Sequence, residues 1–248
     1  MKNTPFIAVT SQPVPYHADT TAIFNTLCQQ NSNSLLLDSA EIGSKNSLQS
    51  LILINAAVKI TCLGNQVTFR ALNANGKQVL KEIHPVLSQL GTVSAVSFDN
   101  EFSVQFAPLD NQLDEDSKLQ AATIFDGLRV ISNHYQHSST PVFLGGLFAY
   151  DLVANFIPMQ GVELKDDGIH CPDYSFYLAE NLITIDHQSQ QATLKSFCFS
   201  QEEQVEVAKT ALSISQKLKN IDGVLSIKAA SDEVSTNVED PEFTGIVK

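Results

Sequence analysis

Long hydrophobic runs are missing from this sequence of 248 residues. It contains no stretch of about 18 uninterrupted apolar residues, so a membrane-spanning helix of ordinary length is excluded. The first 20 residues contain one lysine and no continuous apolar segment, and a secretion signal requires such a segment. We therefore expect a cytoplasmic protein.

Cysteine pairs of the kind that bind zinc are missing as well. The cysteines, Cys28, Cys62, Cys171 and Cys198, lie far apart and form no C-x-x-C pair. Such spacing indicates neither a zinc site nor a dense disulfide framework. We expect reduced thiols, most of them buried.

Positive charge is scarce. The sequence has 15 lysine and arginine residues against 27 aspartate and glutamate residues, a formal net charge of −12. Nucleic acids and anionic membranes attract proteins through clustered positive charge. We therefore expect that the protein binds neither nucleic acid nor an anionic membrane. A small ligand or another protein is the expected partner.

The residues that are present suit a globular chain of one or two domains, since 43% are hydrophobic and 17% are charged. Helical periodicity predicts helices at residues 19–30, 77–90, 119–135 and 200–219, with a short one at 151–155. Pro85 is expected to kink or interrupt the second helix. Ser200 and Glu203 have the spacing of a capping box at the start of the last long one.

Alternating or continuous apolar segments predict the strands. They occur at residues 35–37, 51–63, 66–72, 93–98, 101–107, 175–186 and 192–199, and within 142–156. Turn residues join several of them into hairpins, and Asn75-Gly76 predicts a further turn. Gly145-Gly146 permits a bulge or a close backbone approach. The predicted fold class is therefore α+β, with antiparallel sheets built from hairpins and helices packed on them.

The pattern changes after residue 221. Residues 222–241 are polar without a sustained period and predict a linker after one α+β domain at residues 1–221. Residues 242–248, EFTGIVK, are typical of the first turns of a helix. An isolated helix that short is unstable in water, so we expect a further domain to follow Lys248.

Motifs for catalysis are missing. FLGGLFAYDL at residues 143–152 lacks the spacing and the lysine of a phosphate loop, and no serine lies in G-x-S-x-G. His134 and His137 have no evident third metal ligand. The acidic triplet 114–116 favours the start of a helix electrostatically. We therefore expect no catalytic and no metal-binding residue in this chain.

Six segments resemble, in order and spacing, the component I family of anthranilate synthase. They are LLLDSAEIGSKNSLQSL, VKITCLGNQVTFRALNANGKQVL, LDEDSKLQAATIFDGLR, FLGGLFAYDLVANF, CPDYSFYLAENLITIDHQ and the final EFTGIVK. The resemblance covers essentially the whole chain and implies the fold of the family's N-terminal domain. The absence of tryptophan agrees with an enzyme that is needed when tryptophan is scarce.

The resemblance implies a reaction of tryptophan biosynthesis. Chorismate and ammonia give anthranilate and pyruvate, a glutamine amidotransferase subunit supplies the ammonia as the partner, and Mg²⁺ holds the substrate carboxylate. In the family, the catalytic and magnesium-binding residues lie in a chorismate-binding domain that follows the EFTGIVK-like segment. This chain by itself is therefore expected to be the non-catalytic N-terminal part of the enzyme.

The resemblance also implies feedback inhibition by tryptophan at a site that includes Leu37, Asp38, Ser39 and Gln49. Leu37 would face the indole, Asp38 the ammonium group, and Ser39 would supply polar contacts. Members of the enteric type commonly have Glu in place of Asp38 and Lys in place of Gln49, so the affinity is expected to differ. Without the resemblance, residues 37–39 predict only a strand end with a turn.

Two alternatives remain at this point. The chain also shares its expected fold with component I of aminodeoxychorismate synthase, a sister chorismate enzyme. The run SKNSLQSL and the strand LILINAAVKIT are more similar to the anthranilate branch. The other alternative is a stand-alone, non-catalytic module that binds an amino acid or a partner.

Overall fold

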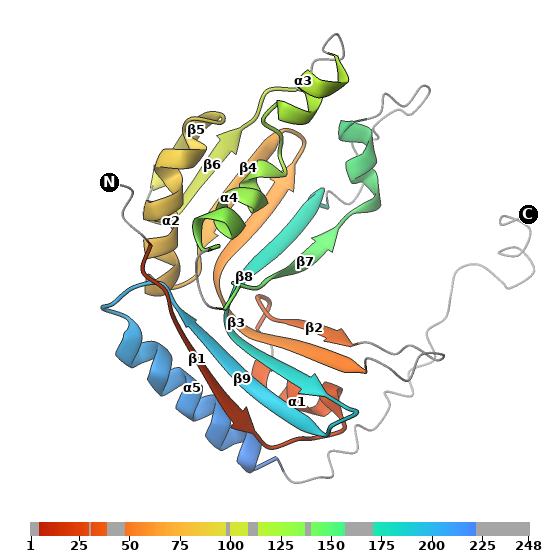
Figure 1. The fold of residues 1–248 in the computed structure, drawn as a ribbon, viewed down its shortest axis with the longest axis vertical. Helices are drawn as coiled ribbons and strands as arrows, with labels where there is room; N and C mark the ends of the chain where they lie inside the picture. Colours follow the sequence, from red (N-terminus) through yellow and green to blue (C-terminus); the bar gives the residue numbers. More distant parts are fainter. Residues whose placement is uncertain are drawn as a thin grey trace, which may run out of the picture.

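The computed structural model describes residues 5–29, 31–38, 48–97, 100–108, 114–136, 140–156 and 171–221. In this part of the chain, nine strands form one antiparallel sheet of curled shape (Figure 1). Its strand order is β1-β9-β8-β3-β4-β6-β5, with β2 paired to β3 and β7 paired to β8. Five α-helices and one 3₁₀ helix accompany the sheet in the described residues, so the expected mixed α and β architecture is confirmed.

Two long strands form the centre of the sheet. β3 (Gln49–Leu63) pairs with β8 (Tyr174–Asp186) along nearly its whole length, with register shifts between Leu53 and Val58. Before the shifts β3 also pairs with β2 (Leu35–Asp38), and beyond them with β4 (Gln66–Ala71). The irregularity lies where the neighbours change, and bulges bend strands in this way.

β8 changes neighbours in the same manner. Its first half pairs with β7 (Leu144–Phe148), and its second half pairs with β9 (Gln191–Cys198). β1 (Ala8–Val14) extends the sheet beyond β9, while β6 (Glu101–Gln105) and β5 (Thr92–Ser97) extend it beyond β4. The predicted hairpins thus belong to one sheet rather than to several, because β3 and β8 run through both halves.

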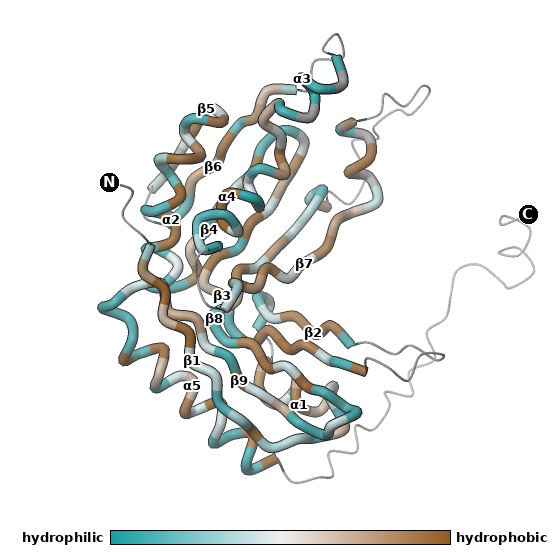
Figure 2. Tube along the Cα trace, viewed as in Figure 1, coloured by the Kyte–Doolittle hydropathy of each residue, from teal (hydrophilic) through white to brown (hydrophobic). Residues whose placement is uncertain are grey.

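The helices cover the two halves separately. α2 (Ala74–Leu87) and α4 (Asp126–His134) pack together near β3 and β4, while α5 (Gln204–Lys219) lies along β1 and β9 (Figure 1). α1 (Thr20–Cys28) contacts β2, β3 and α5. Hydrophilic and hydrophobic residues alternate along α5 (Figure 2), as expected for a helix with one buried side.

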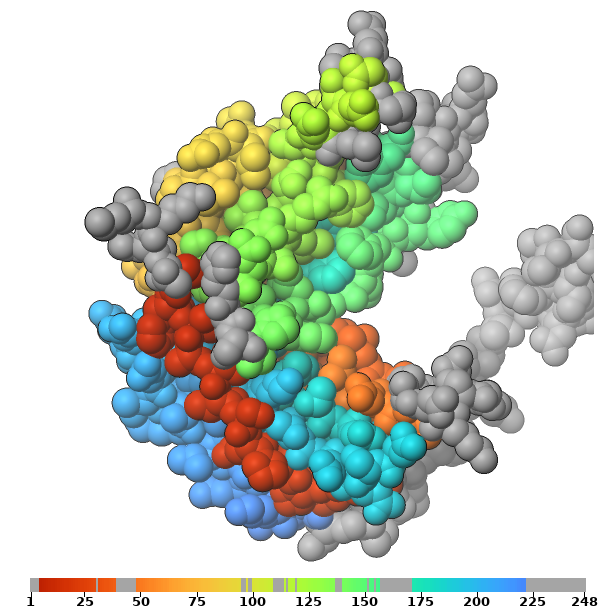
Figure 3. Space-filling model, in the orientation of Figure 1, coloured from red at the N-terminus to blue at the C-terminus, as the bar shows by residue number. Residues whose placement is uncertain are grey.

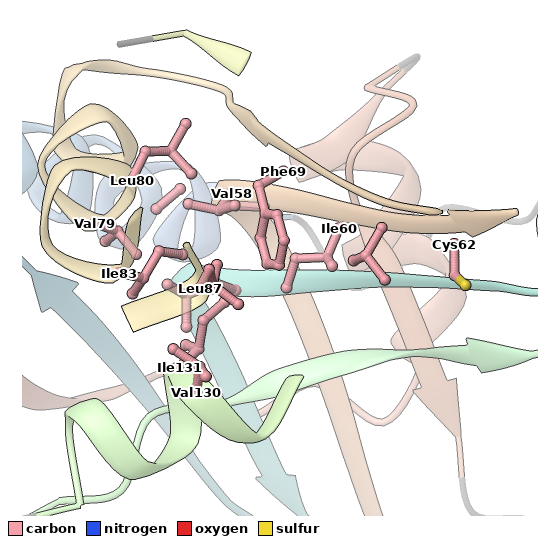
Figure 4. Packing of buried hydrophobic residues seen from close by; sticks show 14 of the residues in the cluster. Val58, Ile60, Cys62, Phe69, Val79, Leu80, Ile83, Leu87, Val130 and Ile131 are labelled. Atoms are coloured by element: carbon pink, nitrogen blue, oxygen red, sulfur yellow. The ribbon is translucent and has the colours of Figure 1, made fainter. Parts of the chain in front are cut away.

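Each half has its own hydrophobic core. Figure 4 shows the first, where Val79, Leu80 and Ile83 of α2 point toward Val58 and Phe69 of the sheet. The second core lies between α1, α5 and the other half of the sheet, and includes Ile23, Ile52, Ile54, Ile183, Leu194 and Ile214. Continuous apolar strands such as β3 fit this arrangement, since both of their faces are covered.

The prediction of a turn at Asn75-Gly76 is wrong, because α2 already begins at Ala74. The side chain of Asn73 caps the helix by accepting a hydrogen bond from the Gly76 amide at 2.9 Å. A β-carbon on Gly76 would lie 1.9 Å from the Ala57 carbonyl oxygen. Gly76 is therefore required by the close approach of helix and strand. Pro85 lies in the last turn of α2, which continues to Leu87.

The single helix predicted at residues 119–135 is also wrong. α3 (Glu115–Gln120) and α4 are separate, because Ala121 has an extended conformation and ends α3. Asp126 then accepts a hydrogen bond from the Thr123 amide at 2.7 Å, which stabilises the turn between them. The side chain of Asp114 caps α3, in agreement with the predicted role of the acidic triplet.

The predicted capping box does not form. α5 begins at Gln204, no side chain caps its first turn, and the Ser200 hydroxyl accepts a hydrogen bond from the amide of Glu202 instead.

The close approach predicted for the glycine pair is confirmed, since a β-carbon on Gly146 would lie 2.1 Å from the Ser175 carbonyl oxygen. After β7 the chain forms the 3₁₀ helix η1 (Tyr150–Asn155), where a short helix was predicted.

Candidate functional site

A chain of polar side chains crosses the ends of β2, β3 and β8. Asp38 is the last residue of β2 and lies opposite Ser50 of β3 in the strand pairing. Its carboxylate accepts a hydrogen bond from the Ser50 hydroxyl at Oδ1. Its other oxygen, Oδ2, accepts from the hydroxyl of Thr20 at 3.2 Å. Both oxygens of an exposed carboxylate are thus held by buried hydroxyl groups.

His187 continues this polar chain from the turn between β8 and β9. Its Nε2 lies 2.8 Å from Ser50 Oγ, and its Nδ1 lies 3.2 Å from the hydroxyl oxygen of Tyr16. The His187 amide also donates to the Leu48 carbonyl at 2.9 Å, which fixes the turn against the start of β3. In Figure 3, atoms in the colours of β2 to β3 and of β8 to β9 meet on one face of the molecule.

The residue types resemble a hydrolytic triad, but their order is different. In such a triad histidine lies between the serine and the acid, and the serine is accessible. Here Ser50 lies between Asp38 and His187, and it is 0% exposed. The arrangement is therefore unsuited to nucleophilic attack and suited to holding the Asp38 carboxylate in place.

The residues predicted for the effector site lie close to this centre. Leu37 precedes Asp38 in β2 and is 39% exposed. Gln49 is exposed at the start of β3, where it lies opposite Asp186 of β8. Ser39 lies outside the described residues. The strand pairing thus brings three of the four predicted residues to one end of the β2, β3 and β8 group.

Sequence reasoning missed Ser50, His187, Thr20 and Tyr16. His187 falls in the predicted turn after residue 186 and is 137 positions from Ser50. Ser50 follows Gln49 directly in β3. Its side chain points to the opposite face of the sheet, since neighbouring residues in a strand point to opposite faces. That alternation is the one signal in the sequence that Ser50 faces inward.

A second polar centre lies where α2 begins. Glu180 of β8 is buried, and its Oε2 accepts from the side-chain amides of Asn73 and Asn75, each at 2.9 Å. Burial raises the pKa of Glu180, the two amides offset this only in part, and the charge of Glu203 adds to it. These groups line a cavity of about 330 Å³ that also contacts α5. The hydrogen bonds from Asn73 and Asn75 to Glu180 attach the start of α2 to the sheet.

A third group joins α2 to α4. Glu82 accepts hydrogen bonds from Tyr135 at 2.9 Å and from Gln78 at 2.9 Å, and its Oε2 lies 3.0 Å from Nε2 of His134. Burial raises the pKa of Glu82, but these hydrogen bonds outweigh burial and leave the pKa below its ordinary value. His134 therefore has a structural partner. His137, the other half of the histidine pair, lies outside the described residues.

The cysteines carry free thiols, and Cys28, Cys62 and Cys198 are buried. Burial raises the pKa of Cys62 to about 12, and the nearby charge of Asp173 adds to the effect. In the described part of the chain, no group of three His, Cys, Asp or Glu side chains is placed to hold a metal ion. Nor does any helix described there have the length and apolar character needed to cross a membrane.

Comparison with known proteins identifies relatives over the whole chain. A family model described as chorismate binding enzyme matches residues 79–247, from within α2 onward. The chain is 84% identical to anthranilate synthase component 1 of Haemophilus influenzae over 243 residues, 98% of this chain and 47% of that protein. It is 40% identical over 258 residues to the Vibrio cholerae protein of that name, 100% of this chain and 48% of the relative.

A third relative is the anthranilate synthase component 1 of Escherichia coli, which is 34% identical over 239 residues, 94% of this chain and 45% of the relative. The chain thus spans about half the length of the curated relatives it matches. The predicted linker at residues 222–241 and helix start at 242–248 lie outside the described residues.

Proposed function

The chain belongs to the family of chorismate binding enzymes, and from this membership we propose that it is the N-terminal part of an anthranilate synthase component 1. The observation that carries the proposal is the 84% identity over 98% of the chain to a protein of that name. Residues 1–221 would form the regulatory domain, residues 222–241 a linker and residues 242–248 the start of the catalytic domain. The fold would be that of the N-terminal domain of component I.

The proposed reaction converts chorismate and ammonia to anthranilate and pyruvate. A glutamine amidotransferase subunit is the proposed partner and the source of ammonia. We assign the proposed Mg²⁺ site and the catalytic residues to the part of the enzyme beyond this chain. The free thiols agree with a cytoplasmic location.

The catalytic proposal is tested by joining this chain to the remaining C-terminal part of the Haemophilus influenzae relative. We call this protein the joined chain. With chorismate, an ammonium salt and Mg²⁺, it is expected to release anthranilate and pyruvate in equal amounts. Release of aminodeoxychorismate without pyruvate would instead support the sister chorismate enzyme, and identification of the aromatic product separates the two.

We further propose that tryptophan binds at the exposed end of β2, with Leu37, Asp38, Ser39 and Gln49 in the site. Support comes from the carboxylate of Asp38, which is exposed while buried groups hold both of its oxygens. A fixed carboxylate at a strand end suits the ammonium group of an amino acid. Leu37, the preceding residue of β2, is an exposed apolar side chain.

Asp38→Asn tests this site, because it keeps the size of the side chain and removes its charge. A hydrogen bond to a charged group contributes about 1.5–3 kcal/mol, so tryptophan is expected to bind roughly 10- to 100-fold more weakly to the joined chain. Calorimetric titration measures the affinity. Asp116→Asn, at an exposed position in α3, is the matched control. Unchanged affinity in Asp38→Asn would show that Asp38 is not in the tryptophan site.

A further inference from the structure

The polar chain from Tyr16 to Asp38 has a defined direction, because the number of hydrogens is limited. An ionised carboxylate only accepts hydrogen bonds, so the single hydroxyl hydrogen of Ser50 must point to Asp38. Ser50 Oγ then has only its lone pairs left for His187. The hydrogen between Ser50 and His187 must therefore come from Nε2 of the imidazole.

The same argument fixes the other side of the ring. A neutral imidazole with a hydrogen on Nε2 has an acceptor at Nδ1. The Tyr16 hydroxyl, 3.2 Å away, then donates to Nδ1. In this arrangement each donor meets an acceptor, and the order of donation runs from Tyr16 through His187 and Ser50 to Asp38.

The surroundings hold this order in place. Ser50 is fully buried and Thr20 is 5% exposed, so neither hydroxyl can turn to bulk water without moving a strand or a helix. Asp186, the neighbouring acid, accepts from the amides of Gln188 at 2.9 Å and Ser189 at 3.0 Å. It thereby shapes the turn that carries His187, and Tyr16 meets the imidazole edge-on with ring centres 5.9 Å apart.

We propose that Ser50, His187 and Tyr16 are positioning residues that orient the Asp38 carboxylate for an ammonium-bearing effector. This inference rests on the proposed tryptophan site, and it adds residues of β3, of the β8 to β9 turn and of the segment before α1. Preorganised groups bind more tightly because less ordering is required when the ligand arrives. Loss of an inner member of the chain frees the Asp38 carboxylate to rotate.

The first test is titration of the joined chain with L-tryptophan. Ser50→Ala and His187→Leu are expected to weaken binding about tenfold, the value of roughly one charge-assisted hydrogen bond. His187→Gln keeps an N–H donor and a carbonyl acceptor on one side chain and is expected to restore most of the affinity. Tyr16→Phe is expected to weaken binding about two- to threefold, because it removes only the outermost donor.

Tyr177→Phe is the matched control. It also deletes a single tyrosine hydrogen bond, to the Ser32 carbonyl at 3.3 Å, but at a distance along the sheet from Asp38. Its tryptophan affinity is expected to equal that of the unaltered protein. Equal affinity for Ser50→Ala and His187→Leu, in proteins whose circular dichroism shows the native fold, would overturn the positioning role.

The second test does not depend on tryptophan. Nitrogen NMR of His187 at alkaline pH reports which ring nitrogen carries the hydrogen, and the proposal requires Nε2. Hydrogen on Nδ1 would overturn it, since Nε2 would then take the Ser50 hydrogen away from Asp38. If the Nε2 form is found but tryptophan does not bind the unaltered joined chain, the proposed effector function fails while the hydrogen-bond order stands. The role toward an effector is then overturned with it.

Discussion

At the scale of single residues, two glycines of the sheet illustrate different constraints. Gly146 lies where β7 approaches β8, and a β-carbon there would be 2.1 Å from the Ser175 carbonyl oxygen. Gly64 forms the turn between β3 and β4 with φ of +56°, and a β-carbon there meets nothing within 4 Å. The first position is limited by contact, the second only by backbone conformation.

We predict unequal effects for alanine at these two positions. Gly146→Ala must move β7 away from β8 and is expected to cost several kcal/mol, about 3 or more. Gly64→Ala forces a left-handed conformation at about 1–2 kcal/mol. Urea unfolding of both variants measures the difference, and equal losses would contradict the close approach of β7 and β8.

The site shows how far single residues can be placed from sequence. The placement of Asp38 in a strand next to a run of leucines follows from the sequence, and Asp38 lies in β2 of the structure. The contact of Ser50 with His187 does not follow, because the residues are 137 positions apart and meet only through the pairing of β3 with β8. Local patterns contain no information on that pairing.

At the scale of elements, polar contacts decide where the helices begin and how they are attached. Asn73 and Asn75 bind Glu180, so the segment that predicted a turn becomes the first turn of α2. Local turn chemistry alone favours Asn-Gly as a turn. Glu180 is distant from Asn73 and Asn75 in the sequence. Local sequence patterns therefore do not predict that it holds this segment in a helix.

Glu180→Gln is predicted to stabilise the chain at neutral pH. The pKa of Glu180 is higher in the folded chain than in the unfolded chain, so folding favours its protonated form. The resulting contribution to the free energy of unfolding is fully present below the unfolded pKa of about 4.3 and is lost as the pH rises through the folded pKa. Glutamine keeps an oxygen for Asn73 and Asn75 and removes the buried charge. The expected gain at pH 8 is on the order of 1 kcal/mol.

Thermal unfolding between pH 4 and pH 8, at about one-unit steps, measures this effect. The gain is expected to shrink as the pH falls. Glu206→Gln, at an exposed position lining the same cavity, is the control and is expected to change little. A loss of stability at pH 8 in Glu180→Gln would contradict the account of Glu180.

Glu82→Gln is predicted to have the opposite sign. The pKa of Glu82 is lowered in the folded chain, so folding favours its charged form. The resulting contribution to the free energy of unfolding is present above the unfolded pKa of about 4.3 and is lost as the pH falls through the folded pKa. Replacement removes the charge that Tyr135 and His134 contact. We expect a loss of about 1–3 kcal/mol at pH 7. Unfolding curves measured at pH 7 and at about pH 3 should show that this difference between the two proteins becomes smaller at the lower pH.

At the scale of the whole molecule, the alternation and the hairpins predict the mixed architecture and most strands, and the structure confirms them. These sequence patterns do not predict that all the strands join one sheet. The single sheet forms because β3 and β8 each change neighbouring strands near a bulge. The curl follows from this exchange and produces two cores. The β2 end with Asp38 belongs to the second half.

The most direct measurement of the central claim is anthranilate formation by the joined chain with chorismate, ammonium and Mg²⁺, followed with and without tryptophan. We predict steady release of anthranilate, inhibition by tryptophan, and weaker inhibition in Asp38→Asn at unchanged uninhibited rate. A folded joined chain that binds chorismate but forms no anthranilate would contradict the assignment to anthranilate synthase component 1.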